Sequence, residues 1–463
     1  MQSVKEVDTA AAPAEAQSPS ALPGAITPAP ADGAPALHKA ITLRHAIALY
    51  VSSVLGSGVL VLPGLAAQIA GPASLVAWVV LSIASYPFAY TFATMSARNP
   101  QSGGVYAFAR EAFGRPMAAA VGWLFALWHV FGAPAVTLIA ASYLSYAFPI
   151  SKTAIDLVAF VVILGPYLIN LRGIAMSSRV QVAVIVAILA LLALAVVFSA
   201  PAVQAARFTP FAPKGWLPVG AAAALIFWSF LGYENVSNVA EEFKNPRRDF
   251  GRSILLSVVV IGVMYTGLAV VTVGSGAYAA GGSVAPFAVM LSRVFGPYGA
   301  AGTALLAVAI IFGVVNAYTA GMSRVVLAVA RDGLFPSAFA RVSRRTGAPA
   351  GSLTFLTGLD VVVLVGYVVF DVDLTTALLI PSGAAILIYV IGSAAGIKLL
   401  PDRGPRRALP WLSLVISVVV LPFVGPLALV ALGVGTAAFL YGLLRRRAGR
   451  DAQGANGDAQ RAG

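Results

Sequence analysis

The sequence predicts an all-α integral membrane protein with twelve transmembrane helices. Of its 463 residues, 59% are hydrophobic and only 10% are charged, whereas a soluble domain carries about 25% charged residues. Twelve apolar segments are long enough to cross a bilayer, which takes ~20 residues of helix. The first and the sixth of these segments are interrupted by small or polar residues near their middles. The even number of crossings places both termini on the same side of the membrane.

The segments form two blocks of five, followed by a pair. The first block has approximate limits of 45–70, 74–97, 118–148, 153–171 and 178–199. The second block has approximate limits of 217–239, 253–275, 286–321, 353–370 and 373–398. Because five is odd, the second block, within 215–400, is expected to be inverted relative to the first, within 41–200. The last two segments, 409–423 and 425–444, lie within 405–447 and are separated by Pro422 and Pro426.

The basic residues orient the chain. The net charge is +13, and the cations are distributed unevenly over the predicted loops. If both termini are cytoplasmic, all but four of the 30 lysines and arginines lie on that side; the exceptions are Lys152, Arg207, Lys214 and Arg293. The positive-inside rule therefore predicts cytoplasmic termini, and it accounts for the charge without a nucleic acid partner. The stretches 1–40 and 448–463 are expected to be disordered cytoplasmic tails.

The first segment contains Gly56-Ser57-Gly58 near its middle. Each glycine costs about 1 kcal/mol relative to alanine in a helix. In lipid, an unwound backbone is tolerated only where it faces protein or a water-filled cavity. The sixth segment has a second candidate interruption, from Ser229 to Gly232. Paired broken helices in inverted blocks point to a ligand site near the membrane midplane; for the first, a small-residue packing face is the alternative.

Three motifs together resemble a known family. They are GSGVLVLPG in the first segment, FWSFLGYENVSNVAEEFKNPRRDFGRSI in and after the sixth, and SRVVLAVARDGLFPSAFARVSRRTGAP at 323–349. In order and spacing they are similar to the amino acid–polyamine–organocation superfamily of secondary transporters, over roughly residues 40–445. Within it, the chain is most similar to bacterial exporters of neutral and hydrophobic amino acids. The resemblance implies a plasma membrane protein with a five-plus-five inverted-repeat fold, discontinuous helices 1 and 6, two peripheral helices and alternating access.

An amino acid substrate presents a carboxylate, an ammonium group and a side chain. The backbone N–H groups at the start of a half-helix suit the carboxylate; here they belong to Gly56, Ser57 and Gly58. The family pattern implies that backbone carbonyls accept from the ammonium group, namely those of Val54, Trp228 and Leu231.

The resemblance also implies which residues surround the substrate side chain. Trp228 and Tyr318 fall at positions that carry gating aromatic residues in related transporters, and Trp128 is expected beside them. For each of these aromatic residues, packing in the core or against lipid is the alternative. Ser382 of the tenth segment is a further candidate for the pocket.

Ionisable residues inside predicted spans are candidates for proton coupling. Glu234, just past the second interruption, either carries a proton or caps the broken helix as a hydrogen-bonded carboxylate. His129 either titrates near neutral pH or is structural. Asp360 stands alone in the ninth segment, and we expect no direct role for it. The ARDG stretch at 330–333 resembles the inner-loop signature of the family and is expected to form ion pairs at an inner gate.

The coupling mode stays open at this point. Some family members replace a sodium ion with a lysine in the fifth segment, which has no lysine here. Asn316 and Thr319 are too few to predict a sodium site. Proton-driven antiport, exchange and facilitated transport all remain.

Other function classes are disfavoured. Without cysteine and with three scattered histidines, the sequence predicts no metal site and no cofactor. It has no clustered nucleophile and base for an enzyme and no filter loops for a channel. The expected partners are a small amino acid, the lipid bilayer and, for coupling, protons; no oligomeric state is predicted. An uptake permease or exchanger of the same fold is one alternative, and a membrane sensor that binds an amino acid without moving it is another.

Overall fold

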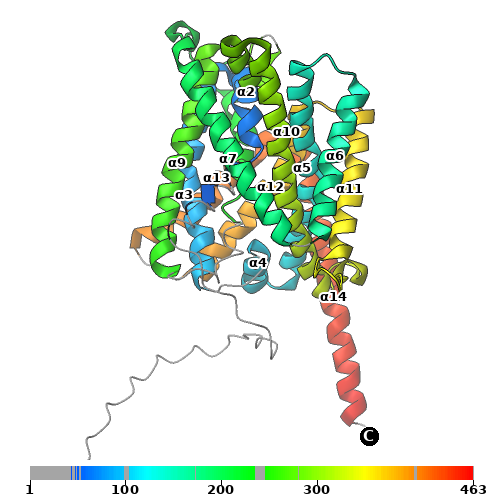
Figure 1. The fold of residues 1–463 in the computed structure, drawn as a ribbon. Helices are drawn as coiled ribbons and strands as arrows, with labels where there is room; N and C mark the ends of the chain where they lie inside the picture. The colour runs from blue at the N-terminus through cyan, green and yellow to red at the C-terminus, as the bar shows by residue number, and fades with distance from the viewer. Residues whose placement is uncertain are drawn as a thin grey trace, which may run out of the picture. The chain divides into compact units, whose positions relative to one another are not determined.

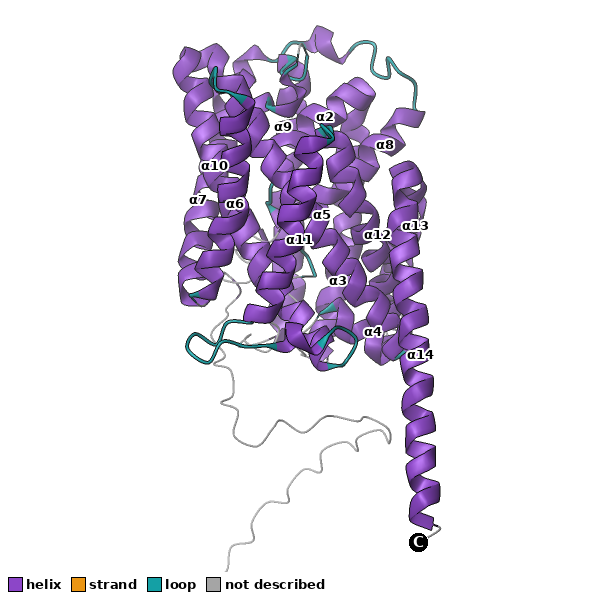
Figure 2. Ribbon diagram, turned by 90° about the vertical axis from the view of Figure 1, so that its right-hand side faces the viewer, coloured by secondary structure: helices purple, strands orange, loops and turns teal. Residues whose placement is uncertain are grey.

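The computed structural model describes residues 43, 47, 50, 51, 54–98, 104–172, 174–234, 246–279, 281–400 and 404–461. All of them belong to one compact unit, Lys39–Gly463. Every regular element within these ranges is helical, and the helices lie side by side with no strand among them (Figures 1 and 2). The predicted all-α class is therefore confirmed. The predicted tail 1–40 lies outside the described residues.

Each predicted segment corresponds to a helix. The first block contains α2 (Gly58–Ala70), α3 (Ser74–Arg98), α5 (Arg115–Ala147), α6 (Lys152–Leu171) and α7 (Ile174–Ser199). The second block contains α8 (Leu217–Ile226), α9 (Pro246–Ser275), α10 (Pro286–Arg331), α11 (Ala350–Val369) and α12 (Leu374–Leu399). The chain ends with α13 (Ala408–Val420) and α14 (Ala428–Arg461). A short helix, α4 (Val105–Phe113), precedes α5.

The apolar helices make this a multi-pass membrane protein. In the described ranges, eight helical stretches are long and apolar enough to cross a membrane. Two of the eight, Gly58–Ser96 and Gly404–Arg445, each join two predicted segments. The shorter apolar helices Val186–Ala202 and Leu217–Phe230 match the fifth and sixth segments.

Local sequence signals mark the helix boundaries. Ser151 caps the start of α6, where its hydroxyl accepts from Ala154 N at 3.3 Å. Asp373 caps α12 in the same way, accepting from Thr376 N at 3.0 Å. These side chains satisfy amides that have no partner inside the helix. Gly114 separates α4 from α5 with a φ of 85°, a conformation that favours glycine.

One sequence expectation differs from the structure at the C-terminus. The stretch 448–463 is predicted as a disordered tail, whereas α14 continues as a helix to Arg461. Helix propagation beyond an existing turn is far easier than nucleation, so α14 extends through this stretch although Gly449, Gly454 and Gly457 lower its helix propensity.

α5 lies at the centre of the bundle and positions the site. It packs against α10, α12, α14 and α11. Many of its buried residues are small, and its helical path continues through Pro134. Outer helices expose large apolar side chains instead, for example Leu157 of α6 and Val197 of α7. This distribution fits a bundle in lipid, where the outer surface is as apolar as the core.

Candidate functional site

The first predicted interruption is present. Leu55 N donates to Val51 O in a last helical turn, and the backbone then bends through Leu55 and Gly56. A new helix, α2, begins at Gly58 with Ser57 at its N-cap position. The amides at the start of α2 therefore lie inside the bundle, where an anion is favoured by the helix dipole.

The second predicted interruption is also present. α8 ends at Ile226 and tightens into a 3₁₀ turn, η4 (Phe227–Phe230). Leu231 is then extended, and Gly232 has a φ of 123°. The backbone here has left the helix, so its peptide groups need partners other than the usual helical ones.

The two interruptions lie against each other. The Tyr265 hydroxyl of α9 donates to the carbonyls of Val54 and Ser229, at 2.8 Å and 3.0 Å. Trp228 Nε1 lies 3.4 Å from Ser57 Oγ. One side chain from a third helix thus holds both unwound segments, and one hydrogen bond joins them directly.

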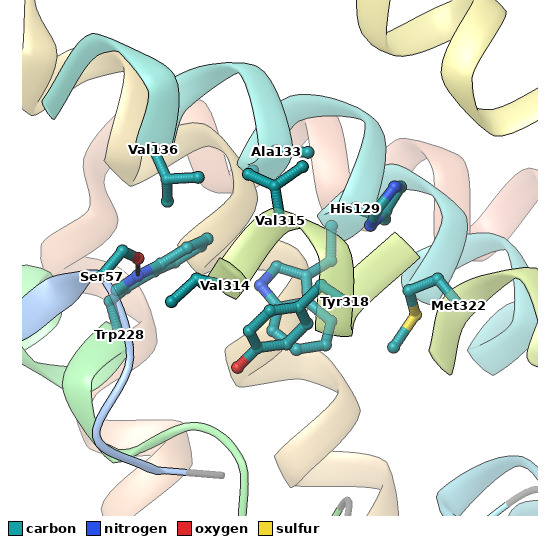
Figure 3. Close-up of a pocket in the computed structure, with 11 residues that line it drawn as sticks. Ser57, His129, Ala133, Val136, Trp228, Val314, Val315, Tyr318 and Met322 are labelled. Atoms are coloured by element: carbon teal, nitrogen blue, oxygen red, sulfur yellow. Dashed lines mark hydrogen bonds between the residues drawn. The ribbon is translucent and has the colours of Figure 1, made fainter. Parts of the chain in front are cut away.

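A cavity with about 340 Å³ of empty space opens beside the interruptions (Figure 3). Its walls come from α5, α10 and the two interruptions, and they are mostly apolar. The lining residues are Ser57, Trp128, His129, Gly132, Ala133, Val136, Trp228, Val314, Val315, Tyr318 and Met322.

Three aromatic side chains form one wall of the cavity. The ring of Trp128 meets those of Trp228 and Tyr318 edge to face, with centroids 6.2 Å and 5.4 Å apart. Trp128 Nε1 is buried without a hydrogen-bond partner among the described residues. Gly132 leaves room for Trp228, because a Cβ there would lie 2.8 Å from the Trp228 ring.

The structure brings together most of the residues singled out from the sequence. Ser57, Trp128, His129, Trp228 and Tyr318 all line the cavity. The other predicted residues of the interruptions adjoin it without lining it; these are Val54, Gly56, Gly58 and Leu231.

Two predicted groups already have partners in this conformation. The Val54 carbonyl accepts from Gly56 N at 2.7 Å and from the Tyr265 hydroxyl. The Ser382 hydroxyl donates to Leu378 O of its own helix at 2.6 Å, and Ser382 is not among the lining residues.

Several lining residues escaped sequence reasoning. Gly132, Ala133 and Val136 follow Trp128 and His129 at helical spacing on α5. Residues about four apart share a helix face, so extending the periodicity from Trp128 identifies them. The same rule leads from Tyr318 to Met322 and to Val314 on α10.

Glu234 is bonded to the broken backbone rather than to the cavity. Its Oε2 atom accepts from Gly232 N at 2.9 Å and from the Tyr389 hydroxyl at 2.5 Å. Both bonds fix the turn that follows η4. This geometry matches the second of the two sequence-based interpretations of Glu234, a carboxylate that caps the broken helix.

Asp360 is not isolated, contrary to the sequence-based expectation. Its Oδ2 atom lies 3.3 Å from His129 Nε2, and both side chains are almost completely buried. The two residues come from α11 and α5, which pack together. Position in the sequence hid this pair, because only the folded bundle brings the helices into contact.

A polar cluster joins α4 to the end of α10. Asp332 Oδ2 accepts from the Tyr106 hydroxyl at 2.5 Å and from Arg110 Nη1 at 2.8 Å. Arg115 donates to the Asp332 backbone carbonyl at 2.6 Å. Burial, and next the hydrogen bond to Asp332, raise the pKa of the Tyr106 hydroxyl, so it remains a donor at neutral pH. These are partners for the ARDG stretch predicted to form ion pairs.

Comparison with known proteins points to one family along nearly the whole chain. A family model described as amino acid permease matches residues 41–443. The chain is 36% identical over 377 residues to YecA of Bacillus subtilis, described as an uncharacterized amino acid permease, covering 81% of this chain and 88% of YecA. It is 32% identical over 404 residues to YjeH of Escherichia coli, an L-methionine/branched-chain amino acid exporter, covering 86% and 94%. It is 28% identical over 322 residues to BcaP of Bacillus subtilis, a branched-chain amino acid permease, covering 65% and 69%.

Proposed function

The chain belongs to the amino acid permease family, and we propose that it is a secondary active transporter of neutral, hydrophobic amino acids. The family consists of transporters rather than enzymes. The observation that carries the substrate class is the cavity itself, which places apolar and aromatic side chains next to two unwound backbone segments.

The geometry supports a division of labour in substrate binding. The amides at Ser57 and Gly58 face the substrate carboxylate at the positive end of α2, and the Gly56 amide joins them once it leaves the Val54 carbonyl. The ammonium group meets carbonyls of the second interruption, at Trp228 and Leu231, together with the Val54 carbonyl once the Tyr265 hydroxyl and the Gly56 amide move away from it. Because these acceptors carry no full charge, a zwitterion is balanced without a counter-ion from the protein.

The substrate side chain occupies the apolar part of the cavity. Ala133 and Val136 of α5 face Val314 and Val315 of α10 across this space. No acidic side chain lines it within the described part of the chain, so a cationic side chain would be desolvated there without compensation. Leucine and methionine are therefore favoured over arginine and polyamines.

Transport proceeds by alternating access in a twelve-helix, five-plus-five inverted repeat. α2 and the segment that precedes it form the discontinuous helix 1, and α8 begins the discontinuous helix 6. α13 and α14 are peripheral. The protein lies in the plasma membrane with both termini cytoplasmic, so the Asp332 cluster is on the inner face. Rocking of one helix bundle against the other exposes the cavity to each side in turn.

Export by proton-coupled antiport is the proposed direction, because YjeH, which matches over most of both chains, is named as an exporter. The two candidate proton carriers are Glu234 and His129. Uptake or exchange by the same fold is the second candidate, since BcaP is named as a permease.

Counterflow in reconstituted vesicles tests the substrate class. Vesicles loaded with unlabelled leucine should accumulate labelled leucine and methionine but not labelled arginine or putrescine. Val136→Phe fills the cavity and should reduce leucine counterflow, whereas Val161→Phe, on the exposed face of α6, should leave it unchanged. Preferred exchange of arginine or putrescine, or an active Val136→Phe variant, would overturn the proposal.

A further inference from the structure

A buried pair of ionisable side chains lies at one end of the cavity. His129 Nε2 and Asp360 Oδ2 are 3.3 Å apart, with side-chain exposures of 1% and 2%. Unpaired charge inside a bilayer is costly, and such groups usually mark ion or proton pathways. The pair serves no purpose in the substrate contacts described above, and a hydrophobic pair of similar volume would often be at least as stable.

The two members of the pair have different access to the cavity. His129 lines the cavity next to Met322, at the end away from Ser57 and Trp228 (Figure 3). Asp360 is not a lining residue and lies on α11. Its Oδ1 atom has no hydrogen-bond partner among the described residues. Of the two side chains, the imidazole is therefore the one placed to exchange a proton with the cavity.

Few other ionisable groups approach the pair. Tyr318 of α10 lines the same cavity, and the Tyr367 hydroxyl of α11 donates to Phe131 O at 3.2 Å. Both are phenols, which are neutral at physiological pH. α2, η6 (Gly282–Val284) and η7 (Ser337–Ala340) pack against α5 or α11 and carry no ionisable side chain.

The remaining ionisable groups lie elsewhere on the neighbouring helices. Within the described side chains, none of them joins the ion pair of His129 and Asp360. On α5 and the helices packed against α5 or α11, they are Arg115, Tyr143, Tyr146, Tyr106, Arg110, Glu111, Lys152, Asp156, Tyr167, Arg293, Tyr298, Arg324, Arg331, Tyr389, Lys398, Tyr441 and Arg445.

The net charge of the pair depends on how many protons it holds. With a single proton the pair as a whole is neutral, either as imidazolium and carboxylate or as imidazole and carboxylic acid. With a second proton it carries one positive charge, which a water-filled cavity stabilises and an apolar ligand does not. When the carboxylic acid holds its proton on Oδ1 and accepts from Nε2–H through Oδ2, the other imidazole nitrogen, Nδ1, is unprotonated and can accept the second proton from water.

We propose that His129 and Asp360 form the proton-binding site of the transport cycle, with two protons in the empty carrier and one in the loaded carrier. This rests on the proposed transport of hydrophobic amino acids. When the substrate side chain displaces water from the His129 face, the imidazolium gives one proton to departing cavity water. When the substrate leaves, water returns and the pair takes up a proton. Substrate and proton therefore alternate, as antiport requires, and Glu234 has a structural role.

Binding measurements on the purified wild-type protein provide the first test. Leucine binding should release up to about one proton, seen with a pH indicator in weak buffer. Leucine affinity should fall by up to about tenfold per pH unit on the acidic side of the transition. Leucine binding without proton release anywhere between about pH 5 and 8 would overturn the proposal.

Variants assign the effect to the pair. Asp360→Asn and His129→Gln should retain leucine counterflow at symmetrical pH but lose both proton release and pH-gradient-driven accumulation. Asp156→Asn changes a carboxyl of α6 that does not line the cavity; it is the matched control and should keep both. Coupled accumulation by Asp360→Asn, or its selective loss in Glu234→Gln, would overturn the assignment. If Asp360→Asn does not fold, Asp360→Glu, which keeps a carboxyl, should restore folding and coupling together; a folded Asp360→Glu without coupling would also count against it.

A spectroscopic readout separates this proposal from the transport proposal. The chain has three histidines, so ¹⁵N-histidine labelling yields few signals, and His129→Gln identifies the one of interest. The His129 titration should move when Asp360 is replaced by Asn, whether or not any amino acid is transported. An unmoved titration would refute the pair, whereas absent leucine counterflow in the wild type would refute the transport proposal.

Discussion

Gly58 is the position where the smallest change should have the largest effect. It begins α2 and lies against the second interruption. A Cβ at this position would lie 2.7 Å from Ser229 Oγ, 2.9 Å from Trp228 Cδ1 and 3.0 Å from Leu62 Cδ1. Favourable contacts between carbon atoms are about 3.5–4.0 Å, so Gly58→Ala forces the two interruptions apart.

The size of the effect follows from two opposing terms. Overpacking of this kind costs about 1–3 kcal/mol. Replacement of glycine by alanine returns about 0.4–1 kcal/mol through the unfolded chain. The gain acts on the unfolded chain, whereas the strain acts on the folded carrier, where it falls on Ser229 and on Trp228, which lines the cavity. A cost of about 1–3 kcal/mol corresponds to a factor of about 5–150. We expect the rate of leucine counterflow to decrease by a factor in this range.

A second glycine isolates the packing effect from the backbone effect. Gly267 lies within α9, where an added Cβ meets no atom within 4 Å. Gly267→Ala should transport leucine at the wild-type rate with unchanged or higher thermal stability. Initial counterflow rates per reconstituted protein, with melting curves in detergent, compare the two variants. Wild-type transport and stability in Gly58→Ala would refute close packing of the two interruptions.

Three further variants test separate features. Burial would raise the pKa of the Asp373 carboxyl, but hydrogen bonds, led by those from Thr376, outweigh burial and lower this pKa. The cap therefore stabilises α12 fully above about pH 4. This stabilisation is lost as the pH falls through the lowered pKa of the folded state. The melting temperature of Asp373→Ala should accordingly lie below wild type at neutral pH, by a cap worth ~1 kcal/mol, and converge with it in acid. Tyr265→Phe leaves two backbone carbonyls without their shared donor, at a cost of about 1–3 kcal/mol. Melting temperature and leucine affinity should therefore both fall. Tyr298→Phe, which changes an exposed tyrosine, should alter neither. Asp332→Asn weakens a half-exposed ion pair with Arg110, which is worth about 0.2–1 kcal/mol. This variant should change the counterflow rate only modestly and leave leucine affinity unchanged. An altered leucine affinity would argue against a purely gating role for Asp332.

Local sequence features predicted the helices and their interruptions. Apolar length and the positions of Gly56, Gly58 and Gly232 are properties of short stretches, and they determine where a membrane helix can unwind. The motif resemblance then brought Trp228 and Tyr318 to one site. The interruptions were predictable because their physical cause lies within a few residues of its effect.

Contacts between distant helices were not predictable in the same way. Asp360 and His129 lie on separate helices, and no local pattern signals that α11 faces α5. Tyr265 was overlooked because its role depends on reaching two carbonyls across the bundle. Ser382 was a candidate by position, but its hydroxyl bonds within its own helix, which the sequence does not reveal.

Thiol protection tests the central claim most directly, because the chain contains no cysteine. Ala133→Cys places a single thiol on the cavity wall, and Ala338→Cys places one on the exposed surface of η7. Leucine and methionine should slow the reaction of Ala133→Cys with a small methanethiosulfonate, arginine should not, and Ala338→Cys should be unaffected. Transport of leucine without any protection of Ala133→Cys would contradict the account, since the amino acid would then bind elsewhere.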